Sequence, residues 1–295
     1  MQHSDNLDLA ALQAAKQYMR GVAWPTVIFA GGVFAAYLMT VTGTVLGFVP
    51  LPLAIPVVAV LTYLSYTVLH EAAHGTISGN DASFRWLNDG LGYIAAWIMM
   101  IPLTAHRLEH MAHHRSTNVP DEDPDFAVSA ASQSALSLLR AMPQILWGNY
   151  RYYFANRWGK GHRVQDLVLC LEIFLILAPR LALCIAGYWW EGLALFFVAW
   201  FIGATLLLYL FAYIVHRPHE TVGRYRDTST FVVSGPLGKV VNWLWVYQNY
   251  HSIHHLFPRV PFYRYQKLFA EIEPIMVARG APIHYVGKSG QTVHA

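Results

Sequence analysis

Four long apolar stretches constrain this chain more than any other feature of its sequence. They cover about 22–44, 50–69, 166–189 and 192–215, and each can cross about 30 Å of hydrocarbon as an α-helix. Composition agrees, because 55% of the 295 residues are hydrophobic and 13% are charged, about half the usual charged share of a soluble domain. The net charge of +3 gives no indication of nucleic-acid binding. We therefore expect an all-α integral membrane protein built on four transmembrane helices.

A fifth apolar stretch, 87–103, is interrupted by Asp89 and Gly90. If it crossed the membrane, the histidines after it would lie on the opposite side from the histidines before it. We therefore expect a re-entrant or interfacial segment, broken at Asp89-Gly90, with its backbone groups satisfied by protein.

Positive charge predicts the orientation of the spans. Of the 20 Lys and Arg, all but Arg180 lie outside the spans and outside the two short loops 45–49 and 189–192. The positive-inside rule then places both termini and the histidine-rich segments on the cytoplasmic side of the membrane. We expect this membrane to be a bacterial inner membrane. Arg180 and Glu172 lie within the third span, which indicates pairing inside the bundle or a water-filled cavity.

The chain reads as a single domain, 1–295, with three parts. Residues 1–21 form an amphipathic cytoplasmic helix. Residues 22–215 carry the spans, with a cytoplasmic insert at 104–165. Residues 216–295 form a cytoplasmic helical cap, rich in Pro and aromatic residues.

Three histidine clusters carry the chemistry. One has HxxxH spacing and two have HxxHH spacing, and both spacings place the imidazoles on one face of a helix. A further histidine directly follows the fourth span. The candidates are His70, His74, His110, His113, His114, His216, His251, His254 and His255. One such pair arises by chance, but three clusters on one membrane face predict a metal centre.

The number of imidazoles indicates two metal ions. Neutral nitrogen ligands suit iron, copper, zinc or nickel, and eight or nine exceed what one ion takes. They suit two ions with four or five ligands each. We expect two redox-active iron ions (Fe2+/Fe3+) that use O2, because zinc has no redox chemistry.

Several other polar residues lie close to the clusters in sequence. Carboxylates that could orient the ligand rings are Glu71, Glu109, Asp121, Asp123 and Asp125. The acidic run 121–125 is equally explained as a solvated turn. Asn249 either holds a water on one iron or fixes a loop, and His106 either joins the second cluster or only hydrogen-bonds to it. The aromatic residues 243–265 form a membrane-interface belt or, less favoured, a wall of the substrate entrance.

Taken together, the order of the clusters and their positions after apolar spans resemble the membrane fatty acid desaturase and hydroxylase superfamily, over about residues 50–275. The stretch Gln248–Leu256 with Pro258, Pro261 and Tyr263 is similar to the last box of β-carotene ring hydroxylases. The stretch His110–Arg115, with Asp123–Phe126 and His216–Pro218, is similar to bacterial β-carotene ketolases.

This resemblance implies that the nine histidines hold two irons and that a separate carrier, such as ferredoxin with its reductase, supplies electrons. The expected function is O2-dependent hydroxylation or desaturation of a long hydrophobic lipid, most similar to carotenoid-ring hydroxylation. Glu71 departs from the carotenoid pattern, which usually has Asp after the first box histidine, and is typical of acyl desaturases. The alternatives are a fatty acyl desaturase, an oxidative fatty acid decarboxylase that makes terminal alkenes, and a membrane metal transporter.

Overall fold

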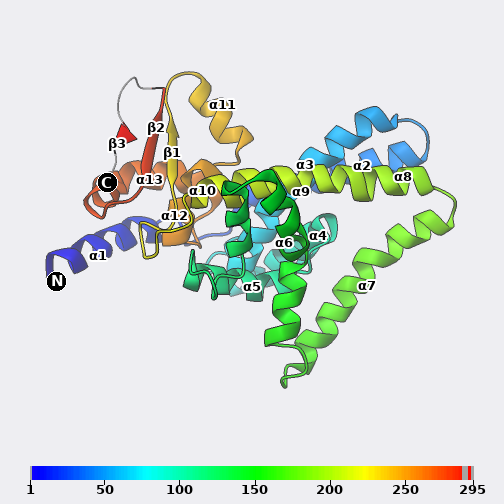
Figure 1. Ribbon diagram of the computed structural model, residues 1–295, viewed down its shortest axis with the longest axis horizontal. Coiled ribbons are helices and arrows are strands. Elements are labelled where there is room, and N and C mark those ends of the chain that lie inside the picture. The colour runs from blue at the N-terminus through cyan, green and yellow to red at the C-terminus, as the bar shows by residue number, and fades with distance from the viewer. Residues whose placement is uncertain (1, 288–291, 294–295) are drawn as a thin grey trace.

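The computed structural model describes residues 2–287 and 292–293, and it is mostly helical (Figure 1). Four helical stretches are long and apolar enough to cross a membrane, as predicted. They are α2 (Trp24–Val45), α3 (Leu51–His74), α7 (Arg163–Ile185) and the continuous stretch Trp189–His216. Figure 1 shows α2, α3, α8 and α9 running side by side, whereas α7 leaves the bundle at an angle.

The last span is not a regular α-helix. Two π-helical segments interrupt it, so that it consists of α8 (Trp189–Leu193), η3 (Ala194–Ala199), α9 (Trp200–Leu207), η4 (Leu208–Tyr213) and α10 (Ile214–His216). Segments of this kind are frequent at functional sites, and η4 ends three residues before the predicted metal ligand His216.

The turn before this span lies earlier than predicted. Residues 189–192, expected to form the loop, are helical, and the chain reverses at 186–188. Gly187 has φ +97° there, a conformation that favours glycine. The aromatic pair Trp189-Trp190 therefore begins the helix, with both indoles exposed.

The stretch expected to be re-entrant forms a helical hairpin of α4 (Arg85–Met99) and α5 (Leu103–Ser116). The predicted break at Asp89-Gly90 is wrong, because α4 runs through both residues, and the chain turns at Met100 with φ +55°. At the tip of the hairpin, the Trp200 indole donates to the Met99 carbonyl at 2.7 Å.

Two charged side chains of α7 cap this hairpin. Glu172 Oε1 accepts from the amide of Leu103 at 2.6 Å, at the start of α5, and a guanidinium nitrogen of Arg180 donates to the Trp97 carbonyl at 2.6 Å, near the end of α4. Each charge has the sign that the nearby helix end favours. The expected pairing inside the bundle is thus between α7 and backbone, not between the two charges.

The insert after α5 contains η2 (Phe126–Ser132) and α6 (Ala135–Asn156). The cap contains α11 (Leu237–Leu244), α12 (His251–Leu256) and α13 (Tyr265–Ala278), with short 3-10 turns at η5 (Gln248–Tyr250) and η6 (Phe262–Arg264). A further 3-10 turn, η1 (Ala82–Phe84), directly precedes α4. The cap also contains a small sheet that the all-α prediction does not include. In it β1 (Thr230–Val233) pairs in parallel with β2 (Ile283–Val286), and β2 pairs antiparallel with β3 (Thr292–Val293).

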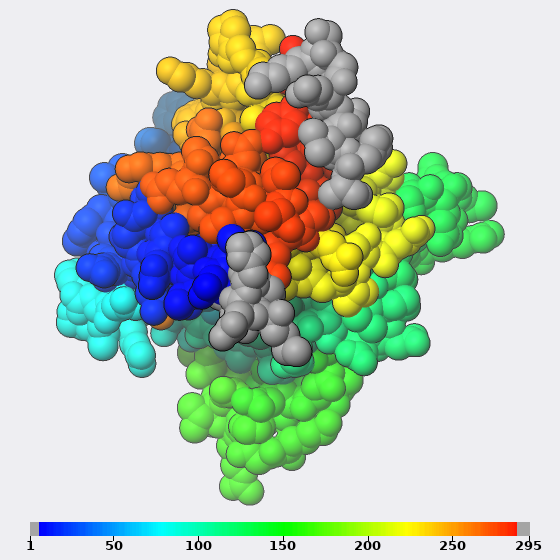
Figure 2. All heavy atoms as spheres, turned by 90° about the vertical axis from the view of Figure 1, so that its left-hand side faces the viewer, coloured from blue at the N-terminus to red at the C-terminus, as the bar shows by residue number. Residues whose placement is uncertain are grey.

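The N-terminal helix α1 (Gln2–Lys16) packs on the cap. Ala11 and Ala15 are fully buried in the same cluster as Leu268 and Ile272 of α13, whereas Leu9 of the same helix is half exposed. Figure 2 looks onto this end of the molecule and shows α1 in blue against α13 in orange. Both ends of the described chain therefore cover the end of the bundle that carries the histidines (Figure 1).

Candidate metal centre

All nine predicted histidines converge at one end of the bundle. The first pair ends α3, three lie on α5, one ends α10 and three lie on α12. Rings from distant parts of the chain are neighbours, with centroids 4.0 Å apart for His70 and His254 and 4.8 Å apart for His113 and His216. The helical spacing of the clusters therefore produces the shared pocket that it predicts.

Eight of these histidines form two groups. The larger contains His70, His74, His110, His114 and His254, and the smaller contains His113, His216 and His255. Within each group, one ring nitrogen per residue lies within 4.8 Å of the others. Two nitrogens on opposite sides of one ion would lie about 4.2 Å apart, so each group is close to the size of one coordination sphere.

His251 belongs to neither group but lies beside the smaller one. Its ring centroid is 4.8 Å from that of His255 and 5.0 Å from that of His216. With His251 included, the arrangement is five and four imidazoles, which agrees with the four or five expected for each ion.

The donor atoms of the centre fit metal ions. Ring nitrogens of His70, His74, His110, His216 and His255 are buried and have no hydrogen-bond partner among the described residues. Burying such groups without a partner is unfavourable, and a cation would satisfy their lone pairs. The Nε2 atoms of neighbouring rings also face one another, as the 2.8 Å between His254 and His114 shows.

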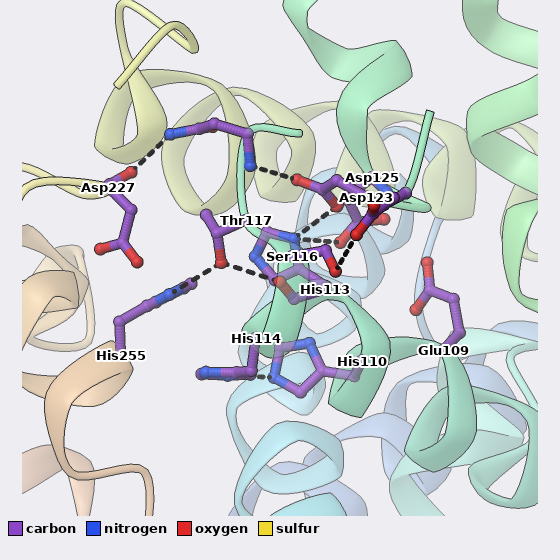
Figure 3. Close-up of polar contacts among 12 residues, drawn as sticks. Glu109, His110, His113, His114, Ser116, Thr117, Asp123, Asp125, Asp227 and His255 are labelled. Carbon is purple, nitrogen blue, oxygen red and sulfur yellow. Dashed lines mark hydrogen bonds and ion pairs between the residues drawn. The ribbon is translucent and has the colours of Figure 1, made fainter. Parts of the chain in front are cut away.

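Hydrogen bonds to the second ring nitrogen orient several of these imidazoles. His113 Nδ1 donates to Asp123 Oδ1 at 2.8 Å (Figure 3), and His251 Nδ1 donates to the Gln248 side-chain oxygen at 3.1 Å. The Tyr265 hydroxyl lies 3.1 Å from His254 Nδ1. Such contacts fix the ring orientation and leave Nε2 free for a metal.

Among the predicted carboxylates, Asp123 alone makes a direct hydrogen bond to a ligand ring in the described chain; it is buried and also accepts from the Asn118 amide. Asp125 Oδ2 is 3.8 Å from His113 Nδ1, whereas Asp121 is exposed. The acidic run is therefore partly a ring-orienting element and partly a solvated turn.

Glu71 and Asn249 connect structural elements near the centre. Glu71 accepts from the Thr26 hydroxyl and the Phe262 amide, which ties α3 to α2 and to the cap. The Asn249 side-chain nitrogen donates to Asn242 and to the Phe231 carbonyl, as a loop-fixing role requires. Its Oδ1 is buried without a partner among the described residues, as a water-holding role requires, so both interpretations remain.

The environment of the centre shifts the pKa values of its histidines outside the spans. Burial lowers the pKa well below its usual value in a set of five: His110, His114, His251, His254 and His255. They are therefore neutral near neutral pH, as metal ligation requires. For His113, burial acts downward, but the hydrogen bond and charge of Asp123 raise the net pKa.

His106 lies outside both groups. Its Nδ1 donates to Asn149 Oδ1 of α6 at 3.0 Å, and its ring stacks on His110 at 5.1 Å. The Glu109 carboxyl is buried beside it, 3.9 Å from His106 Nδ1, and burial raises its pKa well above the usual value. The hydrogen-bonding interpretation of His106 is thus the one that the geometry favours.

A mainly apolar cavity leads to the centre, and many of the residues in its wall were not predicted from the sequence. The lining from the last span forms one stripe: Trp200, Ala204, Leu207, Leu208, Phe211, Ala212 and His216. The opposite wall includes Met142, Ile145 and Leu146 of α6, a helix within the segment that was predicted only as a cytoplasmic insert. None of the aromatic residues of 243–265 is among the lining residues that the structure describes.

The length of this cavity suits a lipid. Trp200 and His216 are 16 residues apart, which corresponds to at most about 24 Å of helix, because part of this stretch is π-helical. Four histidines of the centre, His110, His113, His216 and His251, line the inner end. Fold and site thus define a helical membrane protein with a histidine cluster that could bind metal ions at the end of an apolar cavity.

Comparison with known proteins identifies the family. The fatty acid desaturase family matches residues 46–287, and the chain belongs to this family. Fatty acid conjugase FAC2 A of Calendula officinalis is 22% identical, over 70% of this chain and 63% of its own length. The sn-1 oleoyl-lipid 12-desaturase of Anabaena variabilis is 26% identical, over 80% and 75% of the two chains.

A further relative is the sn-1 acyl-lipid omega-3 desaturase (ferredoxin) of Synechocystis sp., which is 24% identical over 72% of this chain and 64% of its own. The chain thus spans less than two thirds of the length of the conjugase and of this omega-3 desaturase. All three names refer to fatty acids or acyl lipids. The family agrees with the sequence-based resemblance, but these relatives favour acyl lipids over the carotenoids expected from the box motifs.

Proposed function

We propose that the protein is an O2-dependent acyl-lipid desaturase whose nine histidines hold two iron ions. The observation that carries this proposal is the position of the paired histidine groups at the inner end of an apolar cavity of lipid length. The names of the family relatives support an acyl substrate. Carotenoid-ring hydroxylation and fatty acid decarboxylation are the competing reactions, and the experiment described below distinguishes them from desaturation.

Two irons in this centre would supply the oxidising chemistry that breaks an unactivated C–H bond. Desaturation removes two hydrogen atoms from adjacent carbons. With two electrons and two protons from outside, these convert one O2 to two waters. The protein places one C–C bond beside the centre, keeps water out through the apolar wall, and fixes the ligand rings through Asp123, Gln248 and Tyr265.

The electron source is proposed to be a separate carrier protein. One relative's name includes ferredoxin, which supports a small iron–sulfur protein as the donor. The metal transporter alternative is less well supported, because the histidines lie at one end of the bundle and not midway along the spans, where transporter sites are expected.

The test is expression in cells that make β-carotene and are fed labelled fatty acids, followed by mass analysis of all lipids. We expect an acyl chain to lose two hydrogens, and the His254→Ala variant to give no product and bind less iron. A carotenoid that gains one oxygen would replace this proposal with ring hydroxylation, the second candidate that the box motifs resemble. A terminal alkene one carbon shorter than the acid would indicate decarboxylation. Purified protein that binds only zinc would overturn all three.

We also propose that the centre and both termini face the cytoplasm of a bacterial inner membrane, because Lys and Arg are concentrated on that side of the spans. In a background without Cys170 and Cys184, an impermeant thiol reagent should label Phe48→Cys in intact cells. It should label Glu220→Cys only after the inner membrane is opened. The reverse pattern would contradict this orientation.

A further inference from the structure

A second hollow reaches the metal centre beside different histidines from those that line the apolar cavity. It is a surface cleft between the end of α5, the segment 222–227 and α12. Its lining residues are His114, Arg115, Thr117, Val222, Gly223, Arg224, Tyr225, Asp227, His255 and Leu256. None of them lines the apolar cavity. In Figure 2 the yellow segment that contains 222–227 lies next to the teal-green segment at the end of α5, on the exposed end of the molecule.

The cleft reaches one histidine of each group. His114 belongs to the group of five and His255 to the group of three. Their rings stack with centroids 4.3 Å apart and an interplanar angle of 28°. Thr117 Oγ1 lies 3.4 Å from His255 Nδ1 and donates to the His113 carbonyl, so it holds His255 against α5 (Figure 3). Both halves of the centre are therefore reached from this cleft through an imidazole.

The rim of the cleft is positively charged. Arg115 and Arg224 line it and are exposed, and a guanidinium nitrogen of Arg226 lies 4.0 Å from where a Cβ on the lining residue Gly223 would be. The Arg224 guanidinium is held over the rings of Tyr225 and Phe257, at 5.6 and 5.8 Å. Asp227 is the single carboxylate among the described lining residues.

An exposed apolar side chain lies within this charged rim. Val222 lines the cleft and is 50% exposed. A small apolar area surrounded by arginines is the arrangement that an acidic protein surface complements, with the charges mainly accelerating association. The cleft is polar and open, so it does not suit the lipid that we propose for the apolar cavity.

We propose that this cleft is the docking site of an acidic one-electron carrier protein, and that electrons enter the metal centre through the imidazoles of His114 and His255. The inference rests on the proposed function, which requires two external electrons per double bond. Each docked carrier is oxidised by one electron, so two successive dockings supply one turnover. The separate cavity leaves the lipid in place during both.

The test compares charge reversal in the cleft with charge reversal elsewhere. The variant Arg115→Glu/Arg224→Glu is paired with the control Arg140→Glu/Arg151→Glu, two exposed arginines of α6 outside the cleft with the same total change in charge. The probe is a plant-type [2Fe–2S] ferredoxin. Its Kd for the purified, iron-loaded protein is measured in detergent at low salt.

We expect the cleft variant to raise this Kd by about tenfold or more and the control pair to change it little. Raising the ionic strength should weaken binding to the wild type more than to the cleft variant. The milder Arg115→Gln/Arg224→Gln variant should raise the Kd by a smaller factor, and it replaces the charge-reversal variant if that variant unfolds. Equal Kd values for the cleft and control variants, or no binding to the wild type, would overturn the proposal.

A second measurement separates this inference from the proposed function. When the iron is reduced without O2 by dithionite and methyl viologen, the excess reductant is removed and O2 is then added, the cleft variant should desaturate lipid in a single turnover at the wild-type rate. Loss of that rate would mean that the arginines support the centre itself, which would also overturn docking as their role. If neither the wild type nor the cleft variant makes a lipid product after chemical reduction, the desaturase proposal fails, whereas the ferredoxin Kd values still decide the docking site.

Discussion

The hydrogen bond between His113 and Asp123 is the strongest side-chain support that the structure gives to any ligand ring, because both groups are buried and lie 2.8 Å apart. The Asp123→Asn substitution removes the charge and nearly preserves the shape. We expect iron affinity or turnover to fall about 10- to 100-fold, as for other carboxylates that orient metal-binding histidines. Iron titration of the purified variant measures this effect.

The matched control is Asp121→Asn, which removes an exposed charge from the same turn. It should leave iron binding and turnover unchanged. If the two variants behave alike, Asp123 belongs to a solvated turn and does not orient the ring.

Single residues also show where sequence reasoning stops. Spacing predicted eight of the nine histidines, because i, i+3 and i, i+4 positions share a helix face, and the ninth, His216, was predicted from its position after the fourth span. It did not distinguish Asp123 from Asp121 or Asp125, since that choice depends on how the turn after α5 folds back. Gln248 and Tyr265 orient rings as well, but without any sequence signal beyond being near a cluster.

Within the elements, the hairpin of α4 and α5 depends on charges from α7. Replacing Glu172 with Leu would leave the amides of Leu103 and Thr104 without their acceptor, at a cost of about 1–3 kcal/mol. We expect a lower thermal unfolding midpoint in detergent and a smaller loss in Glu172→Gln, which keeps an acceptor oxygen. Leu171→Ala, exposed on the same helix, is the control and should change stability least. Equal midpoints for Glu172→Leu and Leu171→Ala would show that the cap contributes little.

Close helix packing makes Gly203 a second sensitive position. A Cβ there would lie 2.4 Å from the Ala59 carbonyl oxygen and 2.8 Å from Thr62 Cβ, so the last span must move away from α3. Gly203→Ala should therefore lower the unfolding midpoint, by the equivalent of about 1–3 kcal/mol, and reduce iron binding through the displaced His216.

Gly31→Ala is the control for this packing effect, because Gly31 lies in another span with open space around its Cβ position. Alanine is the better helix former, so this variant should be neutral or slightly stabilised. A Gly203→Ala protein with wild-type iron content and stability would rule out the packing constraint.

The elements were predicted unevenly. Hydropathy over about twenty residues located all four spans, because a membrane imposes the same length on each. It could not locate the hairpin turn at Met100, where a non-glycine residue takes a left-handed conformation that the surrounding tertiary contacts stabilise. The small sheet and the role of α6 also depend on contacts between segments far apart in sequence.

At the scale of the whole molecule, the buried histidines impose a pH dependence on stability. Burial lowers the pKa of His106 and of His219 to about 4. The usual value in an unfolded chain is about 6.5. Between these values the unfolded chain binds protons that the folded chain does not, so stability rises with pH up to about 6.5 and is then constant.

We therefore expect the metal-free protein to unfold at a lower temperature at about pH 5 than at about pH 7.5. The His106→Asn variant should show a smaller difference, and His162→Asn, at a partly exposed position outside the centre, should show the wild-type difference. Identical midpoints at the two pH values would contradict the buried, neutral state of these rings.

The nine imidazoles stand between two hollows that share no lining residue, and this separation has a kinetic consequence. An inert lipid analogue lodged in one hollow takes no space from a protein seated in the other. Inhibition by such an analogue should therefore be competitive towards the lipid but noncompetitive towards the reductant.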